Sequence, residues 1–206
     1  MLPSQFPEVQ GYPHLKQLLA DHIDMQFEDV RVLLRLPEPG SHIGGNFATA
    51  ALLFNIISGA SVAFYKTSMK AVKGKAGGSG DRFRRVLSDH FPMKDIALPE
   101  AVVLKVFYNY SRNPLAHSLG LGGPTSVQVF IAKKALSQKR ILELEDSSTL
   151  PQWSREALFD AGIQPEPSYR IGISGLYWGV HRMLHSVFAD AGEARAADSV
   201  ATKLGF

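Results

Sequence analysis

Apolar residues recur every three or four positions from Leu15 to Leu36, with acidic residues on the other side of the pattern. This spacing is typical of an amphipathic helix, because side chains three and four residues apart lie on one helix face. Pro37 and Pro39 follow, and proline does not fit inside a helix. The pattern therefore predicts one long helix that ends before these prolines.

The segment from Ile43 to Tyr65 contains no charged residue. It is long enough for a helix buried in the middle of a bundle or for a helix that spans a membrane. Several polar residues interrupt it, and the amphipathic helices elsewhere need an apolar partner, so a buried helix is the favoured interpretation. The polar residues include Asn46, Thr49, Asn55, Ser58 and Ser61.

Other segments also show helical periodicity, at residues 81–90, 100–112, 171–189 and 193–204. Ser154 as an N-cap, with Gly162 just past the end, predicts a further short helix.

The segment from Ser126 to Leu136 is ambiguous. Its first half alternates apolar and polar residues like a strand, while Ala132–Leu136 favours a helix, and we expect a helix overall. The whole pattern predicts a mainly α fold, a helical bundle with additional peripheral helices. We expect residues 1–206 to form a single domain, with its core at about 13–190 and a peripheral C-terminal helix at 192–205.

The composition is that of a globular protein, with 206 residues, 45% hydrophobic and 20% charged. The absence of cysteine excludes disulfides, thiolate metal sites and cysteine nucleophiles. The first residues show neither the basic nor the apolar region of a secretory signal, which favours a cytoplasmic protein. The net charge of +3 argues against a general packager of nucleic acid.

Basic residues are nevertheless concentrated in one segment, whose only acidic residue is Asp81. Such a segment attracts phosphates, and it is the first candidate for RNA binding, although a solvated charged surface is an equally simple explanation. Its basic residues are Lys66, Lys70, Lys73, Lys75, Arg82, Arg84 and Arg85.

Candidate chemistry lies in the segment Tyr-Ser-Arg-Asn-Pro-Leu-Ala-His that ends at His117. Pro114 disfavours a helical Asn113 but suits the first position of a new helix, so Asn113 is the predicted N-cap. Arg112 then ends one helix and His117 lies in the first turns of the next. A guanidinium that binds phosphate and an imidazole that transfers a proton near neutral pH are suited to cleavage of an RNA backbone.

Arg112-Asn113 followed by His117 resembles the R-x4–6-H motif of the HEPN superfamily, and the apolar residues before Arg112 resemble its arginine-bearing helix. The resemblance implies a small helical bundle that acts as a metal-independent ribonuclease, or a descendant that kept the fold. It gives His117 the role of general acid or base, Arg112 that of binding the scissile phosphate, and Asn113 that of holding either. Second-tier candidates with nearby hydroxyl groups are Tyr108, Tyr110 and Ser111.

The resemblance also implies a homodimer in which two motifs line one cleft, with RNA as a substrate and a cognate antitoxin or other protein as a partner. No metal or other cofactor is expected. The glycine-rich segment Gly120–Pro124 departs from the family pattern, because it interrupts the helix that carries the histidine. Two alternatives stay open. One is a non-catalytic HEPN-like module that binds RNA, nucleotide or a protein; the other is a membrane-associated helical protein, although a membrane is the less favoured partner.

His181 and His185 are separated by one helical turn, a spacing that suits zinc. Arg182 stands where the metalloprotease pattern has its glutamate, so a structural role is favoured. Gly74–Gly80 lacks the Gly-Lys-Ser/Thr order of a phosphate-binding loop and is expected to be a flexible loop.

Overall fold

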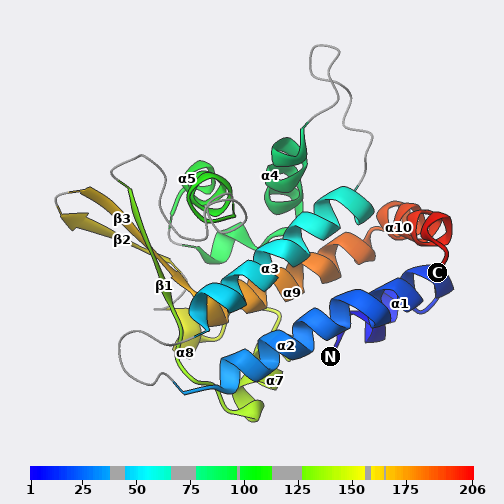
Figure 1. The fold of residues 1–206 in the computed structure, drawn as a ribbon, viewed down its shortest axis with the longest axis horizontal. Helices are drawn as coiled ribbons and strands as arrows, with labels where there is room; N and C mark the ends of the chain where they lie inside the picture. The colour runs from blue at the N-terminus through cyan, green and yellow to red at the C-terminus, as the bar shows by residue number, and fades with distance from the viewer. Residues whose placement is uncertain (38–44, 66–77, 97, 113–126, 156–158, 165) are drawn as a thin grey trace.

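The computed structural model describes residues 1–37, 45–65, 78–96, 98–112, 127–155, 159–164 and 166–206. The chain is mainly α, as the sequence predicts, with a small sheet at one end (Figure 1). The α-helices are α1 (Pro13–Leu18), α2 (Asp24–Arg35), α3 (Asn46–Gly59), α4 (Ser79–His90), α5 (Glu100–Lys105), α7 (Gln138–Asp146), α8 (Gln152–Arg155), α9 (Ile173–Ala189) and α10 (Ala191–Leu204). The strands are β1 (Gln128–Ala132), β2 (Phe159–Gln164) and β3 (Glu166–Gly172).

Short 3-10 turns precede or join these elements, at η1 (Pro3–Gln5), η2 (Pro7–Val9) and η6 (Met93–Asp95). Three helices also contain a π-helical part, which keeps the helix continuous but shifts the side chains on it. These parts are η3 (Leu19–Ile23) between α1 and α2, η5 (Ala60–Phe64) after α3, and η7 (Val106–Arg112) after α5. The long helix predicted between Leu15 and Leu36 is therefore present, and it ends just before Pro37.

The sheet corrects two predictions. The expected helix at Ser126–Leu136 is wrong, since residues 128–132 form β1, which pairs in parallel with β3. The short helix expected from Ser154 to Gly162 is also wrong: α8 ends at Arg155, and β2 pairs with β3 in antiparallel fashion. The alternation at Val129 and Ile131 is the local pattern that agrees with a strand. Pairing with β3 favours the strand over a helix, because β3 supplies hydrogen-bond partners for the backbone of β1.

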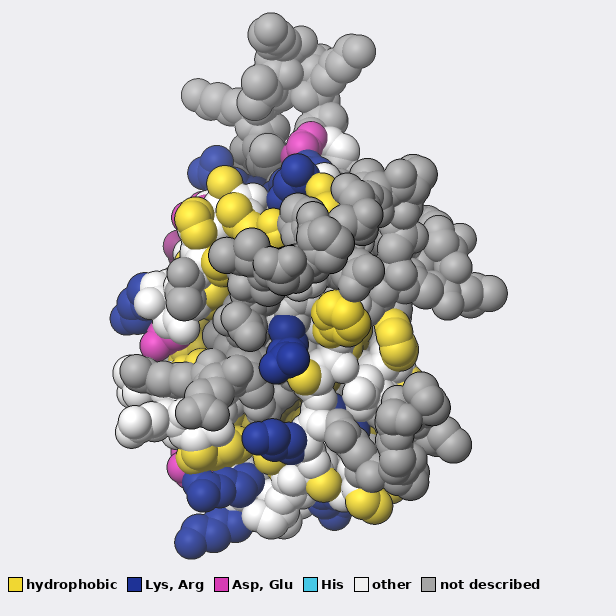
Figure 2. All heavy atoms as spheres, turned by 90° about the vertical axis from the view of Figure 1, so that its left-hand side faces the viewer, with side chains coloured by type: hydrophobic (Ala, Val, Ile, Leu, Met, Phe, Trp, Pro, Cys, Tyr) yellow, Lys and Arg dark blue, Asp and Glu magenta, His cyan; other side chains and the backbone are white. Residues whose placement is uncertain are grey.

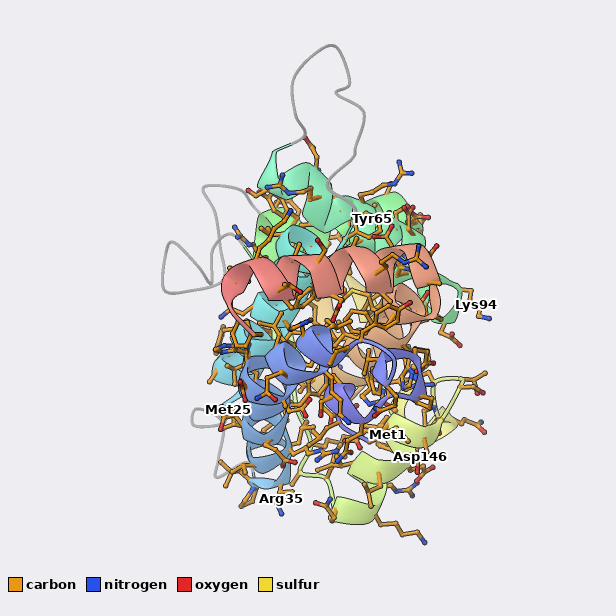
Figure 3. All side chains as sticks on the ribbon, turned by 90° about the vertical axis from the view of Figure 1, so that its right-hand side faces the viewer. Met1, Met25, Arg35, Tyr65, Lys94 and Asp146 are labelled. Atoms are coloured by element: carbon orange, nitrogen blue, oxygen red, sulfur yellow. The ribbon has the colours of Figure 1, made fainter. Side chains whose placement is uncertain are left out.

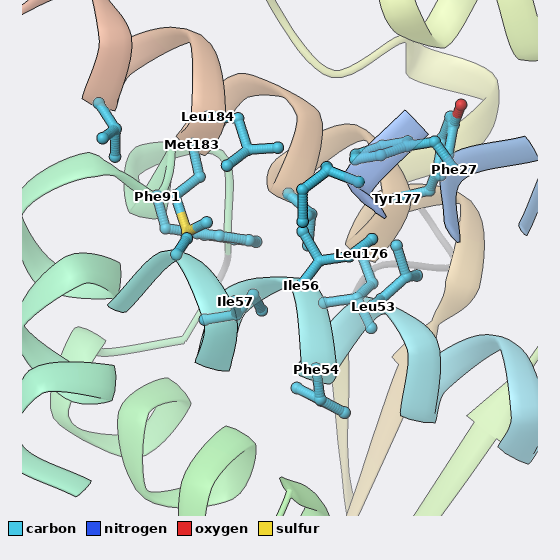
Figure 4. Close-up of a cluster of buried hydrophobic side chains, with 14 of the residues drawn as sticks. Phe27, Leu53, Phe54, Ile56, Ile57, Phe91, Leu176, Tyr177, Met183 and Leu184 are labelled. Carbon is cyan, nitrogen blue, oxygen red and sulfur yellow. The ribbon is translucent and has the colours of Figure 1, made fainter. Parts of the chain in front are cut away.

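The core lies between α3 and α9, which run side by side through the middle of the molecule (Figures 1 and 4). Figure 4 shows Leu53 and Ile56 of α3 directed toward Leu176 of α9, with Phe27 of α2 beside Tyr177. Helices α4 and α5 cover one side of this pair, and α1 and α2 cover the other. Residues outside the predicted core also take part, since Phe6 and Val9 are fully buried.

Helix α3 together with η5 gives one stretch, Asn46–Phe64, that is long and apolar enough to cross a membrane (19 residues, mean hydropathy 1.8). Half of it is buried inside the protein. Leu53, Phe54, Ile56 and Ile57 are all in the core cluster. This packing is that of a central bundle helix, and the location of the protein in the cell stays a prediction.

A buried carboxylate, that of Glu145 on α7, joins several segments. It is 1% exposed and accepts hydrogen bonds from Arg31 of α2 (Nε to Oε1, 2.8 Å; Nη2 to Oε2, 2.7 Å) and from the Tyr177 hydroxyl of α9 (2.5 Å). The amino group of Met1 forms an ion pair with it at 2.5 Å, and Figure 3 shows Met1 near the end of α7 that carries Asp146. Burial alone would raise the pKa of Glu145, but these bonds lower it.

We expect Glu145→Gln to lower the free energy of unfolding by about 3 kcal/mol, because it removes the buried counter-charge of the largely buried Arg31, which keeps only its ion pair with the exposed Glu28. Glu143→Gln, two residues earlier on the same helix, is the matched control. Its carboxylate is partly exposed and pairs with the exposed Arg140, so a much smaller loss is expected. Urea denaturation of both variants measures the difference, and equal losses would contradict the structural role of Glu145.

A second pair of variants tests the α4–α9 packing. A Cβ added to Gly179 would lie 2.6 Å from Cε2 of the buried Phe91 ring, so we expect Gly179→Ala to cost about 1–3 kcal/mol by overpacking. An added Cβ at the exposed, helical Gly59 meets nothing within 4 Å. Gly59→Ala should stabilise the protein by about 0.5–1 kcal/mol, because alanine loses less backbone entropy in a helix. Thermal unfolding should therefore show a lower midpoint temperature for Gly179→Ala and a higher one for Gly59→Ala than for the wild type.

Candidate functional site

Helix α4 and the π-helical segment η7 meet at Tyr108. Gly80, in the first turn of α4, allows this approach, since an added Cβ would lie 2.5 Å from the Tyr108 hydroxyl and 2.6 Å from Cζ. Phe83, one turn further along α4, is buried against the same ring with centroids 5.4 Å apart. The Tyr108 ring is therefore held between two elements while staying partly exposed.

Two arginines lie over this ring. The guanidinium carbon of Arg84 is 4.4 Å from the ring centroid, and that of Arg112 is 5.7 Å from it. Arg84 donates from Nη2 to Oδ1 of Asn109 (3.1 Å), and Arg112 donates from Nε to the Ser58 hydroxyl of α3 (3.3 Å). We refer to Arg84, Tyr108, Asn109 and Arg112 as the Tyr108 cluster.

The cluster carries two positive charges, and Arg84 has an acidic neighbour. That neighbour is the exposed Asp81, whose Oδ1 is 3.4 Å from Nη1 of Arg84. An exposed pair of this length contributes little binding energy and is readily exchanged for a phosphate oxygen. Because the ring lies beside two guanidinium groups, an anion bound there would also have an aromatic surface next to it.

Arg82 and Arg85 of the predicted basic segment do not join the cluster. Arg85 faces another side of α4, where Nε lies 2.7 Å from Oδ2 of Asp89 and the Tyr65 hydroxyl also donates to that carboxylate. Burial and this bond raise the pKa of Tyr65 to about 12. Burial would raise the pKa of Asp89, but the bonds from Tyr65 and Arg85 lower it. Arg82 is half-buried, and its Nε has no partner among the described residues.

The other second-tier residues lie around η7. Tyr110 is half-buried with the ammonium of Lys105 5.5 Å from its ring centroid. Ser111 is fully buried, and its hydroxyl has no hydrogen-bond partner among the described residues. Of these three residues, Tyr108 belongs to the cluster, Tyr110 packs against Lys105, and Ser111 lies in the protein interior.

Several predicted site residues lie outside the described residues, and they flank the cluster in sequence. The segment 66–77 directly precedes Gly78 and α4, and 113–126 directly follows Arg112. These segments contain the predicted helix break at Pro114 and the glycine-rich segments. The predicted site residues among them are Lys66, Lys70, Lys73, Lys75, Asn113 and His117.

Two residues at this site are not predicted as site residues from the sequence. Asn109 belongs to the Tyr108 cluster, and Gly80 makes room for the Tyr108 ring. The flexible loop predicted for Gly74–Gly80 is wrong at its end, because Gly80 lies in the first turn of α4 and allows the ring to approach. Asn109 lies between two tyrosines in the sequence. Its position one helical turn after Lys105 does not mark it as a site residue. A π-helical segment changes which side chains share a face, and such segments are frequent at functional sites.

His181 and His185 of α9 are used in packing. The His181 Nε2 lies 2.8 Å from the Met1 carbonyl oxygen, and His185 stacks on Phe6 with ring centroids 3.5 Å apart. Burial lowers the pKa of His181 to about 3, and burial also lowers the pKa of His185. Among the described residues, no group of three or more His, Asp or Glu side chains is arranged to hold a metal ion.

Compared with protein-family models, with characterised proteins and with solved structures, the chain gives no significant match.

The buried His181 makes stability depend on pH. Its pKa in the folded protein lies below the ordinary value of 6.5, so the unfolded chain binds more protons and stability falls as the pH drops from about 6.5 toward 3. Between pH 6.5 and 5, we expect His181 to account for a loss of about 1–2 kcal/mol. Over this range the Glu145 carboxylate, with its lowered pKa, stays ionised.

The measurement is the free energy of unfolding of wild type and His181→Phe at pH 5 to 8. The variant should show a shallower decline below pH 6.5, while the two curves run parallel between pH 7 and 8, where His181 is largely neutral in both the folded and the unfolded chain. Identical slopes below pH 6.5 would contradict a buried, neutral His181.

Proposed function

We propose that this chain is a metal-independent ribonuclease of the HEPN type, in which the Tyr108 cluster binds the RNA backbone and Arg112 acts with His117 in cleavage. The observation that carries the proposal is the position of the motif arginine. Arg112 shares the Tyr108 ring with Arg84 of the basic segment, so two regions far apart in sequence meet at one place.

The cluster suits a single-stranded nucleic acid. Guanidinium groups form paired hydrogen bonds with phosphate oxygens, and an aromatic ring stacks with any base. Arg84 and Arg112 supply the first kind of group and Tyr108 the second. The four lysines of residues 66–77, just before α4 in sequence, add positive charge that would attract further phosphates.

In the proposed reaction, the ribose 2′-oxygen attacks the adjacent phosphorus, and the bond from phosphorus to the 5′-oxygen breaks. His117 accepts the proton of the 2′-hydroxyl or delivers one to the leaving 5′-oxygen. Arg112 stabilises the negative charge that builds on the phosphate, and Asn113 positions the histidine or the phosphate. The products are a 2′,3′-cyclic phosphate and a 5′-hydroxyl, and no metal takes part.

The resemblance further suggests a homodimer with two facing motifs, acting in the cytoplasm and held in check by an antitoxin or other protein. A twofold dimer is also the commonest oligomer in general. Light scattering of the purified protein tests this part. The second candidate function is a non-catalytic module that binds RNA at the same cluster, because the arginines and the Tyr108 ring suit a phosphate and a base whether or not cleavage follows.

The decisive experiment is incubation of wild type and variants with single-stranded RNA in EDTA, measuring cleavage and binding separately. His117→Ala should lose about 10²–10⁴-fold in rate while still binding RNA, as expected for removal of a general acid or base. Arg112→Ala should lose both rate and affinity. Arg84→Ala should weaken binding and lower the slope of log affinity against log salt by about 0.7, the value for one phosphate contact.

Arg35→Ala, an exposed arginine at the end of α2, is the matched control and should leave both readings unchanged. Arg85→Ala should have a small effect, because its side chain is paired with Asp89. RNA binding without cleavage by wild type would overturn the catalytic proposal in favour of the binding module. Cleavage that survives His117→Ala, or binding that is indifferent to Arg84 and Arg112, would overturn the site.

A further inference from the structure

A second cationic site lies beside the sheet, on elements that do not form the Tyr108 cluster. A cavity of about 360 Å³ opens between the segment after β1, helices α7 and α8, and the junction of β3 with α9. This volume is at the lower end of the range of small-molecule sites, about 300–1,000 Å³. Its polar lining comes from Lys133, Lys134, Arg140, Trp153, Arg170 and Ser174.

One wall of the cavity is fixed to the end of α2. The Leu136 amide donates to the Leu34 carbonyl at 2.9 Å, and the buried Lys133 donates from Nζ to the carbonyls of Leu33 (3.1 Å) and Leu36 (2.7 Å). The Lys133 ammonium therefore satisfies carbonyl groups at a helix C-terminus, which is a structural task. Because this wall is anchored, the cavity has a defined shape.

The other cations around the cavity have little counter-charge. Lys134 and Arg170 are exposed and form no ion pair within the described parts of the chain, and Arg140 pairs with Glu143 at 2.9 Å. The backbone register places Asp160 of β2 opposite Arg170. Ser174, in the first turn of the long helix α9, adds the positive end of a helix dipole. Like charges gathered at one cavity repel one another, and a bound anion relieves that repulsion.

An aromatic wall completes the cavity. Trp153 is half-buried, and its indole Nε1 donates to Oε1 of Glu143 at 2.8 Å, which fixes the ring. The Arg140 guanidinium carbon lies 4.7 Å from the ring centroid. Figure 2 looks onto this end of the molecule and shows more Lys and Arg than Asp and Glu side chains on its face. Cationic groups beside a fixed aromatic ring suit a ligand that has both a phosphate and a planar ring.

We propose that this cavity binds a nucleoside monophosphate group, with the phosphate at Lys134 and Arg170 and the base at Trp153. The group comes either from a free nucleotide or from the 5′-phosphorylated end of an RNA strand, which share this chemistry. The site is separate from the Tyr108 cluster, since it lies on the sheet, α7 and α9 and shares no residue with it. The proposal is therefore independent of the ribonuclease proposal.

Tryptophan fluorescence of the full chain provides the test, because the chain contains two tryptophans and the other, Trp178, is fully buried. AMP should change the fluorescence with saturable binding at least about tenfold tighter than adenosine, since charge-assisted bonds to phosphate are strong. Trp153→Phe should abolish the signal. Binding measured by calorimetry should also weaken in that variant.

Lys134→Gln and Arg170→Gln should each weaken AMP binding about tenfold, whereas Lys94→Gln, an exposed lysine on η6, should leave it unchanged. A 5′-phosphorylated trinucleotide that binds more tightly than AMP would assign the group to an RNA end, and weaker binding would assign it to a free nucleotide.

Three results would overturn the proposal. Equal affinities for AMP and adenosine would exclude a phosphate site, and equal affinities for AMP and inorganic phosphate would exclude a role for the base and Trp153. No binding of either AMP or the trinucleotide by a protein with normal circular dichroism would exclude the site altogether.

Discussion

The buried carboxylate of Glu145 fixes three other segments of the chain to α7 at once. It holds Arg31 of α2, Tyr177 of α9 and the start of the chain to α7, a helix that has only one buried face of its own. A carboxylate taken out of water is costly unless all its hydrogen bonds are made, and here the donors come from three different elements. The position of α7 is therefore set by these directed hydrogen bonds as well as by burial of its apolar side chains.

The proposed nucleotide cavity depends on this attachment. Arg140 and Glu143 lie on the same helix α7, so the position of Glu145 in the core sets where they meet Trp153. The opposite wall of the cavity is tied to the end of α2 through Lys133 and Leu136. Since Arg31 belongs to α2, the same helix contacts both the buried carboxylate and the cavity wall. Helices α2 and α7 thus take part both in the core and in the walls of the cavity.

The Tyr108 cluster is supported differently, by close backbone approach. Gly80 lets α4 lie against η7, and the π-helical turn of η7 brings Tyr108, Asn109 and Arg112 near Arg84. The proposed RNA site and the proposed nucleotide cavity thus occupy different elements of the fold.

Local patterns in the sequence predict several of the helices, including the central one, but not α7. Periodic apolar residues predict α1–α2 and α9, and the uncharged stretch predicts α3 as a core helix, because burial of apolar surface is a property of local composition and spacing. The concentration of basic residues and the motif at Arg112 were visible in the same way. For this reason the sequence points to Arg84 and Arg112, the two arginines of the Tyr108 cluster.

Contacts between distant segments determine which of these residues meet. Whether residues 128–132 are a strand depended on β3, about forty residues later in the chain, since a strand needs hydrogen-bond partners from elsewhere. The separation of Arg84 from Arg85 and the sharing of Glu145 among three elements likewise depend on long-range packing. Local patterns determine which face of an element is buried, but contacts between distant elements determine what that face touches.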